Sequence, residues 1–121
     1  MTNADKYMAA LEAIREGVSG FMGATVVDLE TGMSLASNSA RPDFDLDVAA
    51  AYNSEMVKAK LNTMRILNIT SNLEDMLITL GDQLHLIKLV GDGQFVYVAA
   101  DKAATNLALL RAAVNRETAA L

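Results

Sequence analysis

The sequence contains no cysteine, and it has only one histidine and one proline among its 121 residues. A chain without cysteine forms neither disulfides nor thiolate metal sites, and such usage suits a reducing compartment. A single histidine also leaves too few ligands for a zinc centre, because structural zinc sites are built from several cysteine and histidine side chains. We therefore expect no metal site and no bound cofactor.

Basic residues are also scarce, because ten lysines and arginines face 15 aspartates and glutamates, for a net charge of −5. A nucleic-acid partner requires a basic footprint, so this balance argues against one and also disfavours anionic membrane surfaces. No stretch approaches the roughly 18 consecutive apolar residues of a membrane span. The N-terminal residues include acids and lack the apolar core of a signal peptide. We expect a cytoplasmic protein without a membrane span.

The length and the apolar content favour one small domain with a partner. A chain of 121 residues is enough for a single domain, 1–121, and short for two. Apolar residues make up 52% of the chain, slightly above the usual ~45–50%. This excess suggests more apolar surface than one small monomer hides, so we expect a partner or a second copy.

Three short apolar runs, at residues 73–80, 83–90 and 94–100, form the clearest pattern. They are separated by Gly-Asp at 81–82 and by Gly-Asp-Gly at 91–93, which are typical of tight β-hairpin turns. The middle run has apolar residues on both faces of a strand, and such a strand is covered on both sides. We predict an antiparallel meander enclosed between two layers.

Two further strands and three helices are predicted outside the meander. Residues 21–29 are rich in β-branched side chains, and residues 33–38 return as a shorter, more polar strand that suits a sheet edge. Asp45 and Asp101 are the expected N-caps of the second and third helices. Helical periodicity covers residues 3–17, 45–66 and 102–118.

The fold class that follows is α+β, with a single five-stranded antiparallel sheet and three helices in the order α-β-β-α-β-β-β-α. We expect the short first and last helices to pair on one face of the sheet. The long second helix then covers the other face, in a profilin-like layering. No linker, internal repeat or low-complexity segment interrupts this order.

None of the motifs that resemble chemical sites fits its template. His85 lies mid-strand between apolar neighbours, where a packed or partly exposed sheet histidine is expected and a catalytic base is not. The alternating acids at 43–47 resemble the start of a calcium loop, but Val48 and Ser54 stand where that loop needs glycine and glutamate. The glycines at 91–93 precede a strand, whereas a phosphate loop precedes a helix. We expect no catalytic residues, and we expect the protein to act by binding and not as an enzyme.

Two parts of the sequence carry a family resemblance. One is the hairpin GATVVDLETGMSLAS with its V-V-D-x-x-G pattern, and the other is the element order that ends in GDGQFVYVAADKAATNLALLR. Together they resemble the roadblock family of dynein light-chain and GTPase-regulator domains, over about residues 4–118. Residues 26–32 match the family's hairpin, with Asp28 and Gly32 at the patterned places.

The resemblance implies a function in binding. Members of this family have no nucleotide site and no shared catalytic motif. They form homodimers or heterodimers in which the sheet continues across the pair and the second helices lie side by side. They serve as scaffolds, and as partners or activators of small Ras-like GTPases.

We accordingly predict a homodimer that uses strand 73–80 and helix 45–66. The strand is apolar on both faces and is expected at a sheet edge, where exposed backbone groups favour pairing. The alanines of the helix allow close approach of a twofold mate. Ile78→Pro is then expected to split the pair, because proline removes a ladder donor. The predicted dimer residues are Ala49, Asn53, Met56, Lys60, Met76, Leu77, Ile78 and Leu80.

The GTPase is predicted to bind the side of helix 45–66 that points away from the sheet. The candidate contacts are Tyr52, Glu55, Ala59 and Asn62, of which Tyr52 is the expected anchor. Local packing of Tyr52 is the alternative. Two other functions stay open: a structural adaptor in another signalling or motor complex, and a small-molecule sensor, which would need a roomy pocket.

Overall fold

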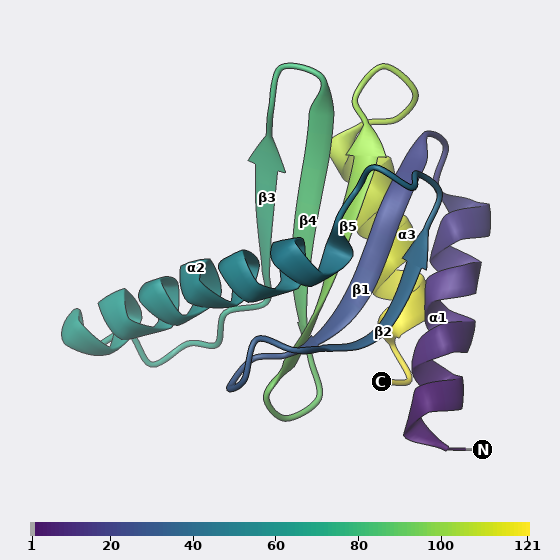
Figure 1. Ribbon diagram of the computed structural model, residues 1–121. Coiled ribbons are helices and arrows are strands. Elements are labelled where there is room, and N and C mark those ends of the chain that lie inside the picture. The colour runs from purple at the N-terminus through teal and green to yellow at the C-terminus, as the bar shows by residue number, and fades with distance from the viewer. Residues whose placement is uncertain (1) are drawn as a thin grey trace.

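The computed structural model describes residues 2–121 as a five-stranded antiparallel sheet between two helical layers (Figure 1). The strands are ordered β2-β1-β5-β4-β3, so β3, β4 and β5 form the predicted meander. The elements are α1 (Asn3–Gly17), β1 (Phe21–Asp28), β2 (Ser34–Ser39), α2 (Leu46–Ile66), β3 (Asp75–Thr79), β4 (Gln83–Val90), β5 (Gln94–Asp101) and α3 (Leu107–Thr118). The predicted fold class and element order are confirmed.

Helices α1 and α3 pack on one face of the sheet, and α2 lies on the other. Leu11 of α1 and Leu110 of α3 are fully buried in one core cluster, and Val57 of α2 is fully buried in a second. Strand β4 contributes Leu86 to the first cluster and Ile87 to the second, as expected for a strand covered on both sides. Each such side chain contributes roughly 1.5–3 kcal/mol through burial.

The third helix begins later than the sequence suggested, at Leu107 instead of residue 102. Asp101 is not its N-cap, because Asp101 ends β5 and its carboxylate accepts a hydrogen bond from the amide of Ala103 at 3.0 Å. The N-cap is Asn106, whose side chain accepts an amide hydrogen bond of 2.9 Å from the first turn. The prediction was wrong here because aspartate and asparagine both cap helices and both close turns.

The two edges of the sheet, β2 and β3, differ in composition and regularity. Strand β2 carries serine or asparagine at four of its six positions, and its register with β1 shifts at a bulge. The hydroxyl groups of Ser34 and Ser37 also hydrogen-bond to the buried Thr25 of β1. Strand β3 pairs regularly with β4 and is largely apolar. A polar, bulged edge resists strand pairing, whereas a regular apolar edge favours it.

Helix α2 ends in a Schellman turn that directs the chain back toward β3 (Figure 1). The amide of Ile69 donates to the carbonyl of Met64 at 2.9 Å, and the amide of Asn68 donates to that of Arg65 at 3.1 Å. Asn68 has a φ of 57°, in the left-handed region that this motif requires. Asparagine tolerates that region better than other side chains do.

We expect Asn68→Val to lower the free energy of unfolding by about 1–2 kcal/mol, because a β-branched residue is strained in the left-handed region. Asn68→Gly is the matched control and should leave stability equal or higher, since glycine adopts this conformation freely. Urea unfolding followed by circular dichroism measures both. An equal loss in the two variants would assign the effect to the asparagine side chain instead of the backbone.

Candidate interaction surface

Helix α2 is the only helix on its face of the sheet within residues 2–121. Asp45 caps it by accepting hydrogen bonds from the amides of Asp47 and Val48, both at 3.1 Å, which confirms the predicted cap. At this end the helix lies close to β1, because a Cβ atom on Gly23 would stand 3.2 Å from Leu46 Cδ2. From there α2 runs across the strands, and its C-terminal end projects past β3 (Figure 1).

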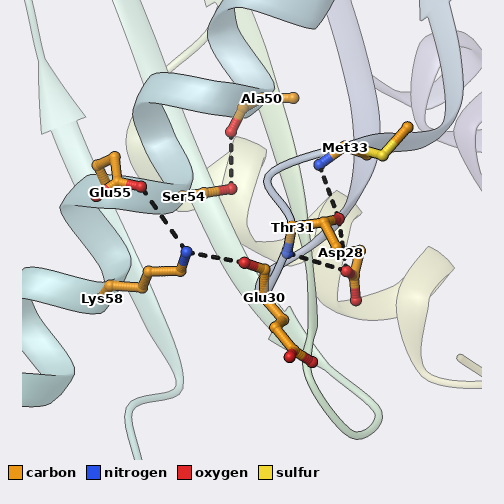
Figure 2. A network of polar contacts seen from close by, with 8 residues as sticks. All are labelled: Asp28, Glu30, Thr31, Met33, Ala50, Ser54, Glu55 and Lys58. Carbon is orange, nitrogen blue, oxygen red and sulfur yellow. Dashed lines mark hydrogen bonds and ion pairs between the residues drawn. The ribbon is translucent and has the colours of Figure 1, made fainter.

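The turn between β1 and β2 lies next to α2 and is ordered by its own hydrogen bonds (Figure 2). Asp28 accepts from the Thr31 hydroxyl at 2.6 Å and from the Thr31 amide at 3.1 Å. These bonds, the hydroxyl bond foremost, hold the pKa of the Asp28 carboxyl below its ordinary value. Gly32 follows with a φ of 74°, which favours glycine. Both residues matched to the V-V-D-x-x-G pattern therefore shape this turn.

The same turn covers one flank of α2. Lys58 Nζ donates to the carbonyl of Glu30 at 2.9 Å and lies 3.8 Å from the Glu55 carboxylate (Figure 2). A Cβ atom on Gly32 would lie 3.5 Å from the hydroxyl oxygen of Ser54, a buried residue of the helix. The helical pattern alone did not reveal these contacts, because they depend on the path of the hairpin.

The other flank of α2 carries the helical part of the predicted dimer interface. Ala49, Asn53 and Met56 are half-buried there, and Lys60 is exposed. Ala49 and Met56 pack against the same core cluster as Met76 of β3. The structure thus brings these helical residues and Met76, Ile78 and Leu80 of β3 to the same side of the sheet, whereas Leu77 lies on the opposite side. Their role in a dimer stays a prediction.

The outer face of α2 carries the predicted partner-binding residues. Tyr52 is 76% exposed, and Glu55, Ala59 and Asn62 are exposed as well. The sequence analysis missed two large apolar residues on the same stripe, which extend it toward both ends of the helix. The signal was present, because positions 48, 52, 55, 59, 62 and 66 alternate in steps of four and three. The missed residues are Val48 and Ile66, which are 50% and 65% exposed.

The hydrogen bonds between β3 and β4 determine which backbone groups of β3 remain free. The amide of Leu80 donates to the carbonyl of Gln83 at 2.8 Å, and the amide of Leu89 donates to that of Glu74 at 3.0 Å. Bonded and non-bonded pairs alternate along an antiparallel ladder. The even-numbered residues of β3 therefore bond to β4, and the odd-numbered residues direct their amides and carbonyls outward.

The outward-facing backbone belongs to Asp75, Leu77 and Thr79. Ile78 lies opposite His85 and bonds to β4. Ile78→Pro would therefore break the hairpin within one chain, which corrects the test suggested by the sequence. The side chains of β3 alternate between the two faces of the sheet. Leu77 packs in the α1–α3 cluster, and Met76 packs in the α2 cluster.

An ion pair ties β3 to α3. Arg111 Nε and Nη2 donate to the two carboxylate oxygens of Asp75 at 2.7 and 2.8 Å, and the Asp75 side chain is only 9% exposed. These hydrogen bonds raise the pKa of Arg111 above its ordinary value. The bidentate geometry fixes the start of the edge strand against the helical layer.

A histidine–tyrosine pair lies on the α2 face of the sheet near the β3–β4 turn. The Tyr97 hydroxyl is 3.2 Å from His85 Nδ1, and His85 Nε2 is 2.8 Å from Gln83 Oε1. The two rings meet edge to face with centroids 5.3 Å apart, and Phe44 stacks on Tyr97 at 6.4 Å. His85 is therefore a partly exposed sheet histidine that packs on Tyr97, within the range predicted. Burial lowers the pKa of His85 and raises the pKa of Tyr97 to about 12.

We expect Tyr97 to make the fold sensitive to alkali. Its pKa is about 12 in the folded chain and about 10 in the unfolded chain, so the unfolded chain loses the proton first. Stability is full below about pH 10 and falls by roughly 2–3 kcal/mol as the pH rises toward 12. Urea unfolding across this range should show a shallower decline in Tyr97→Phe. Identical slopes would contradict the assignment to Tyr97.

The described residues offer a cleft but no metal site. Across residues 2–121, no three histidine, aspartate or glutamate side chains converge as metal ligands would. In the same part of the chain, no helix combines the length and apolar character needed to cross a membrane. A cleft of about 490 Å³ opens between α2 and the β4–β5 turn. Its apolar lining consists of Leu29, Leu61, Leu73 and Leu89.

The arrangement of one helix against a helix pair across an antiparallel sheet is that of the roadblock fold. A roadblock/LC7 domain from Streptomyces avermitilis is 17% identical, with a TM-score of 0.74 over 91% of this chain and 86% of that chain. This confirms the predicted resemblance as a likeness of fold.

Within this fold, the chain is similar to MglB. Myxococcus xanthus MglB is 14% identical, with a TM-score of 0.86 over 98% of this chain and 86% of that chain. A structure described as MglB with tetrameric arrangement is 20% identical, with a TM-score of 0.80 over 96% of this chain and 87% of that chain. No family model and no curated protein matches the sequence.

Proposed function

We propose that this protein is a non-enzymatic, dimeric regulator or scaffold that binds a small Ras-like GTPase in the cytoplasm. The observation that carries the proposal is the exposed outer face of α2, on which Tyr52 is 76% exposed. A large exposed aromatic side chain flanked by other apolar residues is typical of an interface anchor. The likeness of fold to roadblock/LC7 and MglB structures supports the proposal, because the roadblock resemblance implies partners of this class.

The proposed dimer joins two copies through β3 and through the Ala49–Lys60 flank of α2. The contrast between the edges supports this arrangement, because β3 is regular and apolar whereas β2 is polar and bulged. The tetrameric MglB structure shows self-association in a protein of this fold. A twofold pair uses one patch on both copies, and we expect a buried area on the order of 2,000 Å².

The proposed GTPase surface is made by both copies of α2. Side-by-side helices would present two outer faces on one side of a continuous sheet, so that one globular partner contacts both copies. The proposed contacts are Tyr52, Glu55, Ala59 and Asn62, extended by Val48 and Ile66.

The absence of cysteine gives a direct test of the dimer. A Met56→Cys variant should cross-link to its own kind through a short thiol-reactive linker, because Met56 lies on the flank proposed to face the twofold mate. Ala51→Cys is the matched control on the flank next to the β1–β2 turn, and it should not cross-link. A monomer in sedimentation at micromolar concentration would rule the dimer out.

Affinity capture from extracts of the source cells tests the partner. The wild-type protein should recover a Ras-like GTPase, more strongly with a GTP analogue than with GDP. Recovery of other proteins without any GTPase would favour the structural adaptor. A small molecule that co-purifies with the protein in the leucine-lined cleft would favour the sensor.

A further inference from the structure

A patch of side chains stays uncovered on the α2 face of the sheet, beside the free edge. It consists of Ile78, Leu80, Gln83 and His85, which we call the edge patch. Ile78 lies opposite His85, and Leu80 bonds to Gln83, so all four side chains share one face. Leu80 is 41% exposed and the other three are half-buried. In Figure 1 the β3–β4 hairpin rises beyond α2, which leaves this part of the sheet without a helix over it.

Helix α2 is longer than the part of the sheet that it crosses. Its 21 residues span about 30 Å, whereas the three strand spacings from β1 to β3 amount to about 14 Å. The helix starts over β1, where Leu46 approaches Gly23. On the order of half its length therefore projects past the edge strand (Figure 1).

A second copy joined at β3 would bring these two features together. A twofold axis between the two β3 strands, perpendicular to the sheet, turns the second α2 antiparallel to the first. The projecting half of each helix then lies over the other copy's sheet, on the part that its own α2 leaves uncovered. This inference rests on the proposed dimer.

We propose that the C-terminal half of α2 from the second copy closes over the edge patch, so that the charge of His85 regulates assembly. The neutral imidazole fits the site in the tautomer that carries its proton on Nε2. Gln83 Oε1 then accepts from Nε2–H, and Nδ1 accepts from the Tyr97 hydroxyl. Protonation converts Nδ1 into a donor. The Tyr97 hydroxyl must then turn its own proton toward apolar surroundings, because Tyr97 is only 2% exposed.

The charged groups near His85 in its own copy are acidic. Asp82 attracts an imidazolium, but burial outweighs this attraction. Asp101 of β5 lies opposite Gln83 on the same face, and its carboxylate accepts from the amide of Ala103. Ile78 and Leu80 are uncharged, as is Phe44 on the far side of Tyr97, and Lys102 lines a cavity with Thr79 and Leu84 on the other face. Of the charged residues in the projecting helix half, Lys60 lies on the flank proposed to face the second copy. Lys58 instead donates to the carbonyl of Glu30 in its own copy, and Arg65 donates to Asn62 on the outer face. Closure would thus disfavour a cationic imidazole by burial, and Lys60 would add repulsion.

The test measures the dissociation constant of the dimer by sedimentation equilibrium at about pH 8 and about pH 5. The lower value lies well below the ordinary histidine pKa because burial lowers that of His85. The wild-type dimer should weaken by about tenfold at the lower pH, because both His85 side chains of the pair must be neutral for closure. His85→Gln keeps a polar side chain but does not titrate, and its dissociation constant should be the same at both values.

Because His85 is the only histidine, its imidazole signal in proton NMR gives a second readout on the wild-type chain. The pKa of His85 should be lower in samples concentrated above the dissociation constant than in dilute ones. A dimer with equal affinity and equal His85 pKa in all samples would overturn this inference and leave the proposed dimer intact. A chain that is monomeric at both pH values would overturn the dimer itself.

Discussion

Thr79→Pro is expected to raise the dissociation constant of the dimer by roughly 100-fold. Thr79 is exposed, and its amide points away from β4, so proline removes a donor only from the pairing between copies. Because of the twofold symmetry, the second copy loses the same hydrogen bond. Two missing hydrogen bonds cost about 2–3 kcal/mol together, and each 1.4 kcal/mol corresponds to about tenfold in affinity. Sedimentation equilibrium measures the change.

Thr79→Val is the matched control, because it keeps both the amide and the β-branched shape. Its dimer should be as tight as that of the wild type. Both variants should unfold in urea at the same midpoint when monomeric, since the Thr79 amide takes no part in the β3–β4 ladder. A Thr79→Pro dimer of unchanged affinity would show that β3 is not the edge used for assembly.

Tyr52→Ala is expected to weaken binding of a GTP-loaded Ras-like GTPase by about thirtyfold. The tyrosine ring is almost free of intramolecular contacts at 76% exposure, so its removal should leave the fold and the dimer intact. Loss of an aromatic anchor typically costs ~2 kcal/mol or more. Titration of the captured GTPase against immobilised dimer measures the affinity.

Leu109→Ala controls for the loss of exposed apolar surface. Leu109 is 62% exposed on α3, in the opposite layer, and its removal should not change GTPase binding. The double variant Tyr52→Ala with Glu55→Lys adds a charge reversal on the same face. Unchanged capture by this variant would place the GTPase contact away from α2.

The sheet and its two helical layers could be predicted from the sequence because the turn residues and the apolar pattern of the strands indicate the same arrangement. The Gly-Asp turns delimit strands whose apolar faces require two covers, and β4 has the predicted bounds. The start of α3 was missed because Asp101 and Asn106 both suit a cap. The side chains of α2 that were predicted to point away from the sheet do so. Their positions follow from the regular periodicity of a helix.

The sequence could not predict which backbone amides and carbonyls of β3 point away from β4. They depend on which residues bond to β4, and a one-residue change in that register would exchange Ile78 with Thr79 as the outward donor. The contacts of Lys58 and Ser54 with the β1–β2 turn were likewise hidden, because they join segments far apart in the chain. The position of the edge patch relative to the projecting half of α2 also required the three-dimensional arrangement.

The bulged, hydroxyl-rich strand β2 limits how far the proposed sheet can grow. A protein whose sheet had two edges like β3 would add copies at both ends and extend as a filament. At the β2 edge the hydroxyl groups of Ser34 and Ser37 hydrogen-bond to Thr25 of the same sheet. The bulge interrupts the regular register of β2 with β1. We therefore expect each copy to add a strand at one edge only, so that the proposed sheet ends at ten strands.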